Sequence, residues 1–126
     1  MYYDEFIAFQ HAFELKELGF DEPCVGKIYA DGGVILLSYL YRNSDQVGEG
    51  TVCSAPLYQQ AFKWFREVYR FEGIIQQSED STLYKWTLNQ YNEDGKKYVA
   101  DWFEFETYEE AEYDCLLQLI NIAKTL

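Results

Sequence analysis

Apolar residues recur at steps of three and four along three segments of the chain, and this spacing predicts three amphipathic helices. The central segment, residues 54–69 (SAPLYQQAFKWFREVY), carries the widest apolar stripe and is rich in aromatic rings. Ser54 is placed to cap its first turn, and Pro56 fits in that turn because a backbone N–H is not needed there. Since so wide a stripe must be buried, we expect this helix to pack against a sheet.

The other two helical segments lie nearer the ends of the sequence. Residues 4–18 predict a helix with phenylalanines along one side, and Gly19 supplies its C-terminal stop. Residues 107–124 open with Thr-Tyr-Glu-Glu, which has the form of a capping box with Thr107 at the N-cap and Glu110 three residues later.

The remaining apolar runs alternate or are rich in β-branched and aromatic residues, so they predict strands. The first two strands form a hairpin around Asp31-Gly32-Gly33, and the run VILLSYLY in the second is apolar on both faces, which predicts a central strand. Another hairpin follows, with its turn at Asn92-Glu93-Asp94-Gly95. The five predicted strands cover residues 24–29, 34–41, 73–77, 84–91 and 98–105.

The predicted order of elements is therefore α-ββ-α-βββ-α. Short hairpins favour antiparallel pairing, and helices separated by hairpins tend to collect on one face of a sheet. We predict an α+β fold in which a single-layer antiparallel sheet of about five strands is packed by three helices, within a single domain of residues 1–126.

The chain is strongly acidic, with a net charge of −12 and a sequence pI of about 4.3. Direct binding to nucleic acid needs a basic surface that displaces counterions, so the charge argues against it, and against an anionic membrane surface for the same reason. Two interpretations stay open: an ordinary acidic protein, or a protein whose partner carries a basic patch.

The cysteines, the N-terminal sequence and the apolar runs indicate the cellular compartment. Cys24, Cys53 and Cys115 are odd in number and widely separated, which argues against a disulfide framework and a zinc site. We expect all three to be reduced core residues of a cytoplasmic protein. Neither a signal peptide nor an apolar run long enough to span a membrane is visible in the sequence.

Three segments resemble one family of small uncharacterised proteins encoded by gut bacteria and by their phages and mobile elements. They are AFELKELGFDEPC (residues 12–24), CSAPLYQQAFKWFRE (residues 53–67) and TYEEAEYDCLLQLINIAK (residues 107–124). The resemblance implies a shared fold, and because the family has no established activity it transfers no catalytic residues. Residues 29–52 lie outside it.

One acidic run is the densest charged feature. Three interpretations of this run are open: a solvated face, a surface for a basic protein partner, or a divalent metal site. The residues do not have the spacing of an EF-hand metal site. The first turn of a helix favours acidic residues, so Glu109 and Glu110 are explained without a bound ligand. The run consists of Asp101, Glu104, Glu106, Glu109, Glu110, Glu112 and Asp114.

Aromatic residues on the predicted strands form a second candidate surface. Any rings left exposed on the sheet would mark a protein interface sooner than a nucleic-acid platform, because acidic residues outnumber basic ones around them. These residues are Tyr39, Tyr41, Tyr84, Trp86, Trp102 and Phe103.

No catalytic constellation is evident. The single histidine, His11, has no nucleophile at local spacing and is expected at the surface or its boundary, and no glycine cluster has the form of a phosphate-binding loop. We therefore predict no catalytic, cofactor-binding or metal-binding residues. The leading hypothesis is a non-enzymatic accessory protein that binds another protein or a second copy of itself. The alternatives are an inhibitor that mimics nucleic-acid charge and blocks a basic nuclease or DNA-binding protein, and an enzyme whose site is assembled by tertiary contacts.

Overall fold

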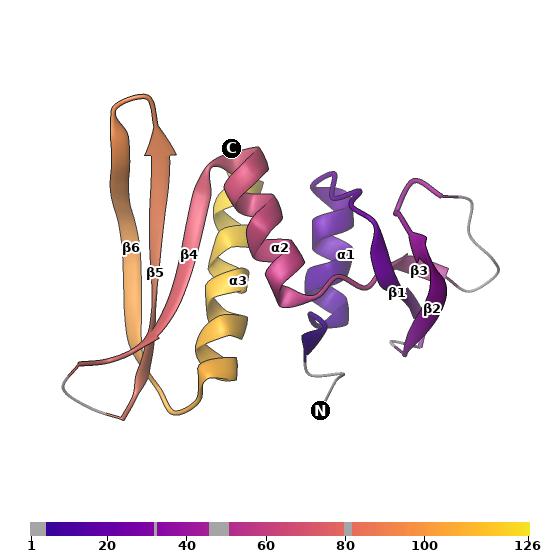
Figure 1. The fold of residues 1–126 in the computed structure, drawn as a ribbon, viewed down its shortest axis with the longest axis horizontal. Coiled ribbons are helices and arrows are strands. Elements are labelled where there is room, and N and C mark those ends of the chain that lie inside the picture. Colours follow the sequence, from indigo (N-terminus) through magenta and orange to yellow (C-terminus); the bar gives the residue numbers. More distant parts are fainter. Residues whose placement is uncertain (1–4, 32, 46–50, 80–81) are drawn as a thin grey trace. The chain divides into compact units, whose positions relative to one another are not determined.

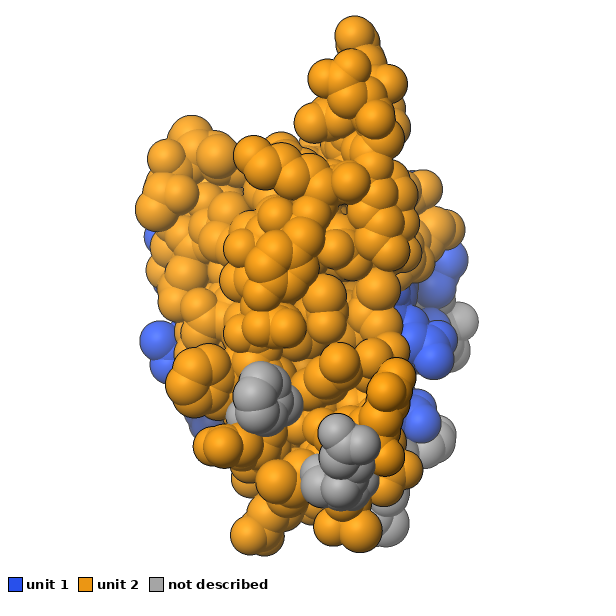
Figure 2. Space-filling view, turned by 90° about the vertical axis from the view of Figure 1, so that its left-hand side faces the viewer, with its two compact units in different colours: residues 1–60 blue, residues 61–126 orange. Residues whose placement is uncertain are grey.

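The computed structural model describes residues 5–31, 33–45, 51–79 and 82–126. These residues form an α+β structure with three α-helices and two antiparallel sheets of three strands each (Figure 1). The predicted single sheet of about five strands is therefore wrong. The contacts group the chain into two compact units, which we call the N-terminal unit (residues 1–60) and the C-terminal unit (residues 61–126), coloured blue and orange in Figure 2. The single domain stays a prediction.

The N-terminal unit contains one helix and one sheet. Helix α1 spans Phe9–Glu17, and the strands β1 (Cys24–Tyr29), β2 (Val34–Tyr41) and β3 (Thr51–Ser54) follow. The predicted hairpin is confirmed, since β1 and β2 are antiparallel neighbours with the predicted bounds. The sheet order is β2-β1-β3, so β1 has a hydrogen-bonded neighbour on both sides.

Strand β3 explains two errors in the predicted N-terminal half. Strand β3 pairs with the second side of β1. Among the described strands β2 therefore lies at the edge of the sheet, and its predicted central position is wrong. Leu40 in β2 is 59% exposed. Ser54 is also not a helix cap: it pairs with Lys27 in the sheet, and its backbone N–H donates to Asn43 Oδ1 at 2.7 Å.

Helix α1 is shorter than predicted and buries a different face. Phe6 lies before the helix, in an isolated bridge with Leu57, and is buried. Phe9 and Phe13 on α1 are exposed, while Leu15 is fully buried. The predicted row of phenylalanines along one side of the helix is therefore wrong, because Phe6 precedes the helix and is not part of it.

The C-terminal unit is a three-stranded meander with helices before and after it. Helix α2 (Tyr58–Trp64) begins in the sequence range of the N-terminal unit and continues as a π-helical turn, η2 (Phe65–Tyr69). Arg70 ends this turn in the left-handed conformation, with φ of 62°. Strands β4 (Phe71–Gln77), β5 (Tyr84–Asn92) and β6 (Gly95–Phe105) follow in sheet order, and helix α3 spans Tyr108–Lys124.

The capping box predicted for the last helix is confirmed at its N-cap. Thr107 has extended backbone, and its hydroxyl accepts the Glu110 backbone N–H at 3.1 Å. Helix α3 then buries a face towards the sheet. Its buried residues are Ala111, Cys115, Leu116, Leu119, Ile120 and Ala123.

Gly73 in β4 sets how closely the helices approach the sheet of the C-terminal unit. A Cβ at this position would lie 2.8 Å from Cys115 Sγ of α3 and 3.0 Å from a ring carbon of Phe62 of α2. A contact as short as that to Cys115 Sγ is essentially never made by a real Cβ atom, and the contact to Phe62 is tighter than most. The side chains of both helices therefore occupy the space that a larger residue would need.

We predict that Gly73→Ala lowers the free energy of unfolding by about 1–3 kcal/mol, because the added methyl group overpacks the core. Urea unfolding followed by circular dichroism measures this loss. Cys115→Ala removes the nearest clashing atom, so the double variant should lose less than the sum of the two single losses. Strictly additive losses would contradict the packing described.

The two buried thiols of the N-terminal sheet predict a pH dependence. Burial raises the pKa of Cys24 and of Cys53 from the ordinary value of 9.0 to about 11. The folded state therefore holds these protons at a pH where the unfolded chain releases them. The contribution of the two thiols to stability is fully present below pH 9 and is lost as the pH rises towards 11.

The melting temperature of the wild-type protein should accordingly decline between pH 9 and 11. The variant Cys24→Ala/Cys53→Ala is the matched control, and its decline over the same pH range should be smaller. Equal declines in the two proteins would show that other groups titrate there.

Candidate functional site

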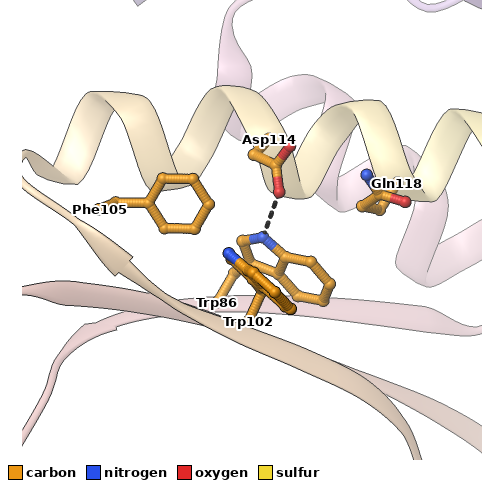
Figure 3. Close-up of a pocket in the computed structure, with 5 residues that line it drawn as sticks. All are labelled: Trp86, Trp102, Phe105, Asp114 and Gln118. Carbon is orange, nitrogen blue, oxygen red and sulfur yellow. Dashed lines mark hydrogen bonds between the residues drawn. The ribbon is translucent and has the colours of Figure 1, made fainter.

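An open pocket of about 400 Å³ lies between helix α3 and strands β5 and β6 of the C-terminal unit. Its volume is near the lower end of the range of small-molecule binding sites. Figure 3 shows the arrangement: the two tryptophans rise from the strands, Asp114 points down from the helix, and Phe105 and Gln118 lie to either side. The lining residues are Trp86, Trp102, Phe105, Asp114 and Gln118. We call this pocket the tryptophan groove.

Regular secondary structure places both walls of the tryptophan groove. Trp86 of β5 and Trp102 of β6 are direct cross-strand partners, so both side chains stand on the same face of the sheet. Asp114 and Gln118 are four residues apart on α3 and therefore share one side of the helix. The groove forms because this side of α3 lies above the end of the β5–β6 pair.

A short hydrogen bond joins the two walls. Trp86 Nε1–H donates to Asp114 Oδ2 at 2.7 Å, as the dashed line in Figure 3 shows. The Trp86 side chain is only 5% exposed, so this bond satisfies a nearly buried donor. A carboxylate has about four lone-pair sites, and Asp114 keeps acceptor capacity towards the groove after receiving one hydrogen bond.

Trp102 gives the groove an exposed aromatic wall. Its side chain is 58% exposed, although it is opposite a buried tryptophan. An indole face attracts cations, and a nearby carboxylate can accept hydrogen bonds from the same cation. The lining contains one acidic residue and no basic residue among those described, so its electrostatics favour a cationic ligand over an anion.

The acidic run is divided between several positions and not gathered at one point. Asp101 and Glu104 lie in β6, Glu106 follows β6, and the others lie on α3; all are exposed except Glu112 and Asp114, which are partly buried. Asp101 accepts a hydrogen bond from the Tyr98 hydroxyl at 2.9 Å, and this bond raises the pKa of Tyr98. Of the seven predicted residues, Asp114 alone lines the groove.

The aromatic candidates also separate. Trp86 and Tyr41 are buried, Tyr84 is partly buried and Trp102 is exposed. The side chains of Tyr39 and Phe103 lie outside the described part of the structure. Gln118 and Phe105 were missed as site residues. Gln118 had one local signal, its spacing of four residues from Asp114 on a predicted helix.

A second hollow lies on α1 of the N-terminal unit, lined by Phe9, Gln10 and Phe13. The two rings meet edge to face at 6.5 Å between centroids. None of its described lining residues is charged, so this hollow has less capacity for specific recognition than the tryptophan groove.

His11 is buried, being 2% exposed, and its predicted position at the surface or its boundary is wrong. Across residues 5–31, 33–45, 51–79 and 82–126, no three His, Cys, Asp or Glu side chains come close enough together to hold a metal ion. Within the same ranges, none of the helices has the length and apolar character needed to cross a membrane.

No family model, curated protein or solved structure matches this chain.

We predict that Asp114→Ala lowers the free energy of unfolding by about 1–3 kcal/mol, because it leaves the nearly buried Trp86 N–H without its acceptor. Asp114→Asn retains an acceptor oxygen at the same position and should lose less. Urea unfolding of the three proteins measures both changes. Equal losses in the two variants would mean that the carboxylate charge, and not the hydrogen bond, stabilises the fold.

Proposed function

We propose that this chain is a non-enzymatic, cytoplasmic accessory protein that binds a basic segment of another protein. In this proposal a cationic side chain of the partner enters the tryptophan groove. The observation that carries the proposal is the exposed Trp102 ring beside the Asp114 carboxylate, in a pocket on a chain with a net charge of −12.

Arginine fits the groove best among the natural cationic side chains. Its planar guanidinium stacks on an indole face and also donates several hydrogen bonds to a carboxylate. Both features are available in the groove, whose lining holds Trp102 and Asp114. Tryptophan is enriched among the residues that dominate binding energy at protein interfaces, and it contributes most when a partner covers it.

The acidic run supports a second candidate, an inhibitor that mimics nucleic-acid charge, because its residues lie close in sequence at the end of β6 and the start of α3. Internal hydrogen bonds already engage several of these carboxylates, among them Asp101 with Tyr98, Glu110 with Thr107, and Asp114 with Trp86. A phosphate mimic needs outward-facing carboxylates, so these bonds favour the groove over the mimic.

A peptide titration tests the proposed function. The probe is acetyl-Gly-Gly-Arg-Gly-Gly-amide, and the control replaces arginine by citrulline, a neutral side chain of the same shape. We expect the arginine peptide to shift the indole N–H resonances of Trp86 and Trp102 in NMR spectra, and to bind about tenfold tighter than the citrulline peptide. Trp102→Ala should weaken binding by about fivefold, which is a cation–π contribution of about 1 kcal/mol.

The mimic predicts a different response to substitution. The variant Glu106→Gln/Glu109→Gln would leave the groove intact and remove two exposed charges. If the protein is a phosphate mimic, this variant should lose affinity for a polylysine probe. If the protein binds through the groove, the variant should keep its affinity for the arginine peptide. If the arginine and citrulline peptides bind equally tightly, the proposal that the groove binds a cationic side chain is wrong. If the affinity for polylysine does not change with salt concentration, the proposal that the protein mimics nucleic-acid charge is wrong.

A further inference from the structure

Aromatic rings form most of the described lining of the tryptophan groove. In Figure 3 the Phe105 ring lies to one side of Asp114, and the two indoles lie below that carboxylate. Trp102 is exposed and Phe105 is partly exposed, so both rings can contact a ligand. Asp114 and Gln118 supply the side-chain oxygens of the described lining. A ligand in the groove therefore meets aromatic rings along β5 and β6 and a carboxylate on α3.

An irregularity in β6 brings Phe105 to the groove side of the sheet. In a regular strand, residues three positions apart point to opposite faces, so Phe105 would face away from Trp102. The pairing of β5 with β6 shifts next to Tyr84, and Glu104 has a φ of 96° at this shift. Tyr84 and Trp86 are two positions apart in β5 and share one face, and Phe105 is opposite Tyr84. The extra residue therefore puts Phe105 and Trp102 on the same face, and both line the groove.

The groove has fewer hydrogen-bond acceptors than an arginine has donors. A guanidinium group carries five N–H donors. Of the described lining residues, Asp114 and Gln118 have acceptor oxygens, and Asp114 already accepts the Trp86 N–H at 2.7 Å. Some donors of an entering arginine therefore face rings instead of acceptors. Displacing water from such donors costs free energy, and this lowers the affinity for unmodified arginine.

Methylation of the guanidinium removes this mismatch. Two methyl groups on one terminal nitrogen replace two N–H donors and keep the positive charge. The remaining three N–H groups, on the other two nitrogens, can still donate to Asp114. The methyl groups add apolar surface, which the rings of Phe105 and Trp102 can cover. Aromatic cages bind methylated cations through this combination of ring faces and charge.

We propose that the tryptophan groove is specific for an arginine of the partner protein that carries two methyl groups on one terminal nitrogen. This inference rests on the proposed function, because it identifies which cationic side chain the groove binds. Unmodified arginine is the weaker ligand, and methylation of the partner strengthens the complex. The groove thus reads a modification that changes neither the charge nor the sequence of the partner.

Calorimetric titration of the full chain with three peptides tests the inference. The peptides are acetyl-Gly-Gly-X-Gly-Gly-amide, in which X is arginine, the asymmetrically dimethylated arginine or citrulline. We expect the dimethylated peptide to bind about fivefold tighter than the arginine peptide, as the burial of about one methyl group would give. If the dimethylated peptide binds no tighter than arginine, the inference is wrong and the proposed function stands. If arginine binds no tighter than citrulline, the proposed function itself is wrong.

A pair of variants locates the preference at the groove. Phe105→Leu keeps an apolar side chain and removes the ring, so it should weaken binding of the dimethylated peptide more than binding of the arginine peptide. The ratio of the two affinities should fall below about twofold. Phe13→Leu is the matched control, because it removes an exposed ring on α1 of the N-terminal unit, and it should keep the wild-type ratio. Circular dichroism verifies that both variants are folded. A folded Phe105→Leu protein that keeps the full preference would overturn the inference.

Discussion

The close approach of two helices to strand β4 at Gly73 is the constraint on which the C-terminal unit depends. Because Gly73 has no side chain, Cys115 of α3 and Phe62 of α2 reach the strand itself. This contact holds α3 over β4 and β5, and the helix has fewer contacts with β6. Trp102, which is on β6, therefore stays exposed, and the tryptophan groove opens between it and the helix.

The hydrogen bond between Trp86 and Asp114 connects this packing to recognition. Trp86 belongs to the buried layer, and its N–H holds the Asp114 carboxylate at the inner wall of the groove. A fixed carboxylate beside an indole face loses little freedom when a cation binds, so the interaction is preorganised. The surrounding acidic surface adds a long-range attraction for basic partners, and this raises the rate of encounter more than the affinity.

Local chemistry made several elements predictable. The hairpin of β1 and β2 was predicted with its observed bounds, because a turn rich in glycine separates two runs of β-forming residues. The N-terminus of α3 was predicted because a capping box acts through residues three positions apart. Strand β3 was missed: its four residues carry little pattern, and the serine within it also fits a helix cap. Once β3 was missed, the sequence offered no reason to place β2 at an edge or to divide the strands between two sheets.

The candidate site, like the fold, was predictable from the sequence only in part. The sequence alone determined the net charge, the tryptophans on two paired strands and the carboxylates on the following helix, since each depends on composition or on a spacing of a few residues. Only the tertiary structure decided that Asp114, and none of the other six acidic residues, meets Trp86, which is 28 positions earlier in the chain. That choice depends on the direction and depth at which α3 packs on the sheet. Packing of this kind is decided by contacts such as those of Gly73, which link residues far apart in sequence and leave no periodic pattern in it.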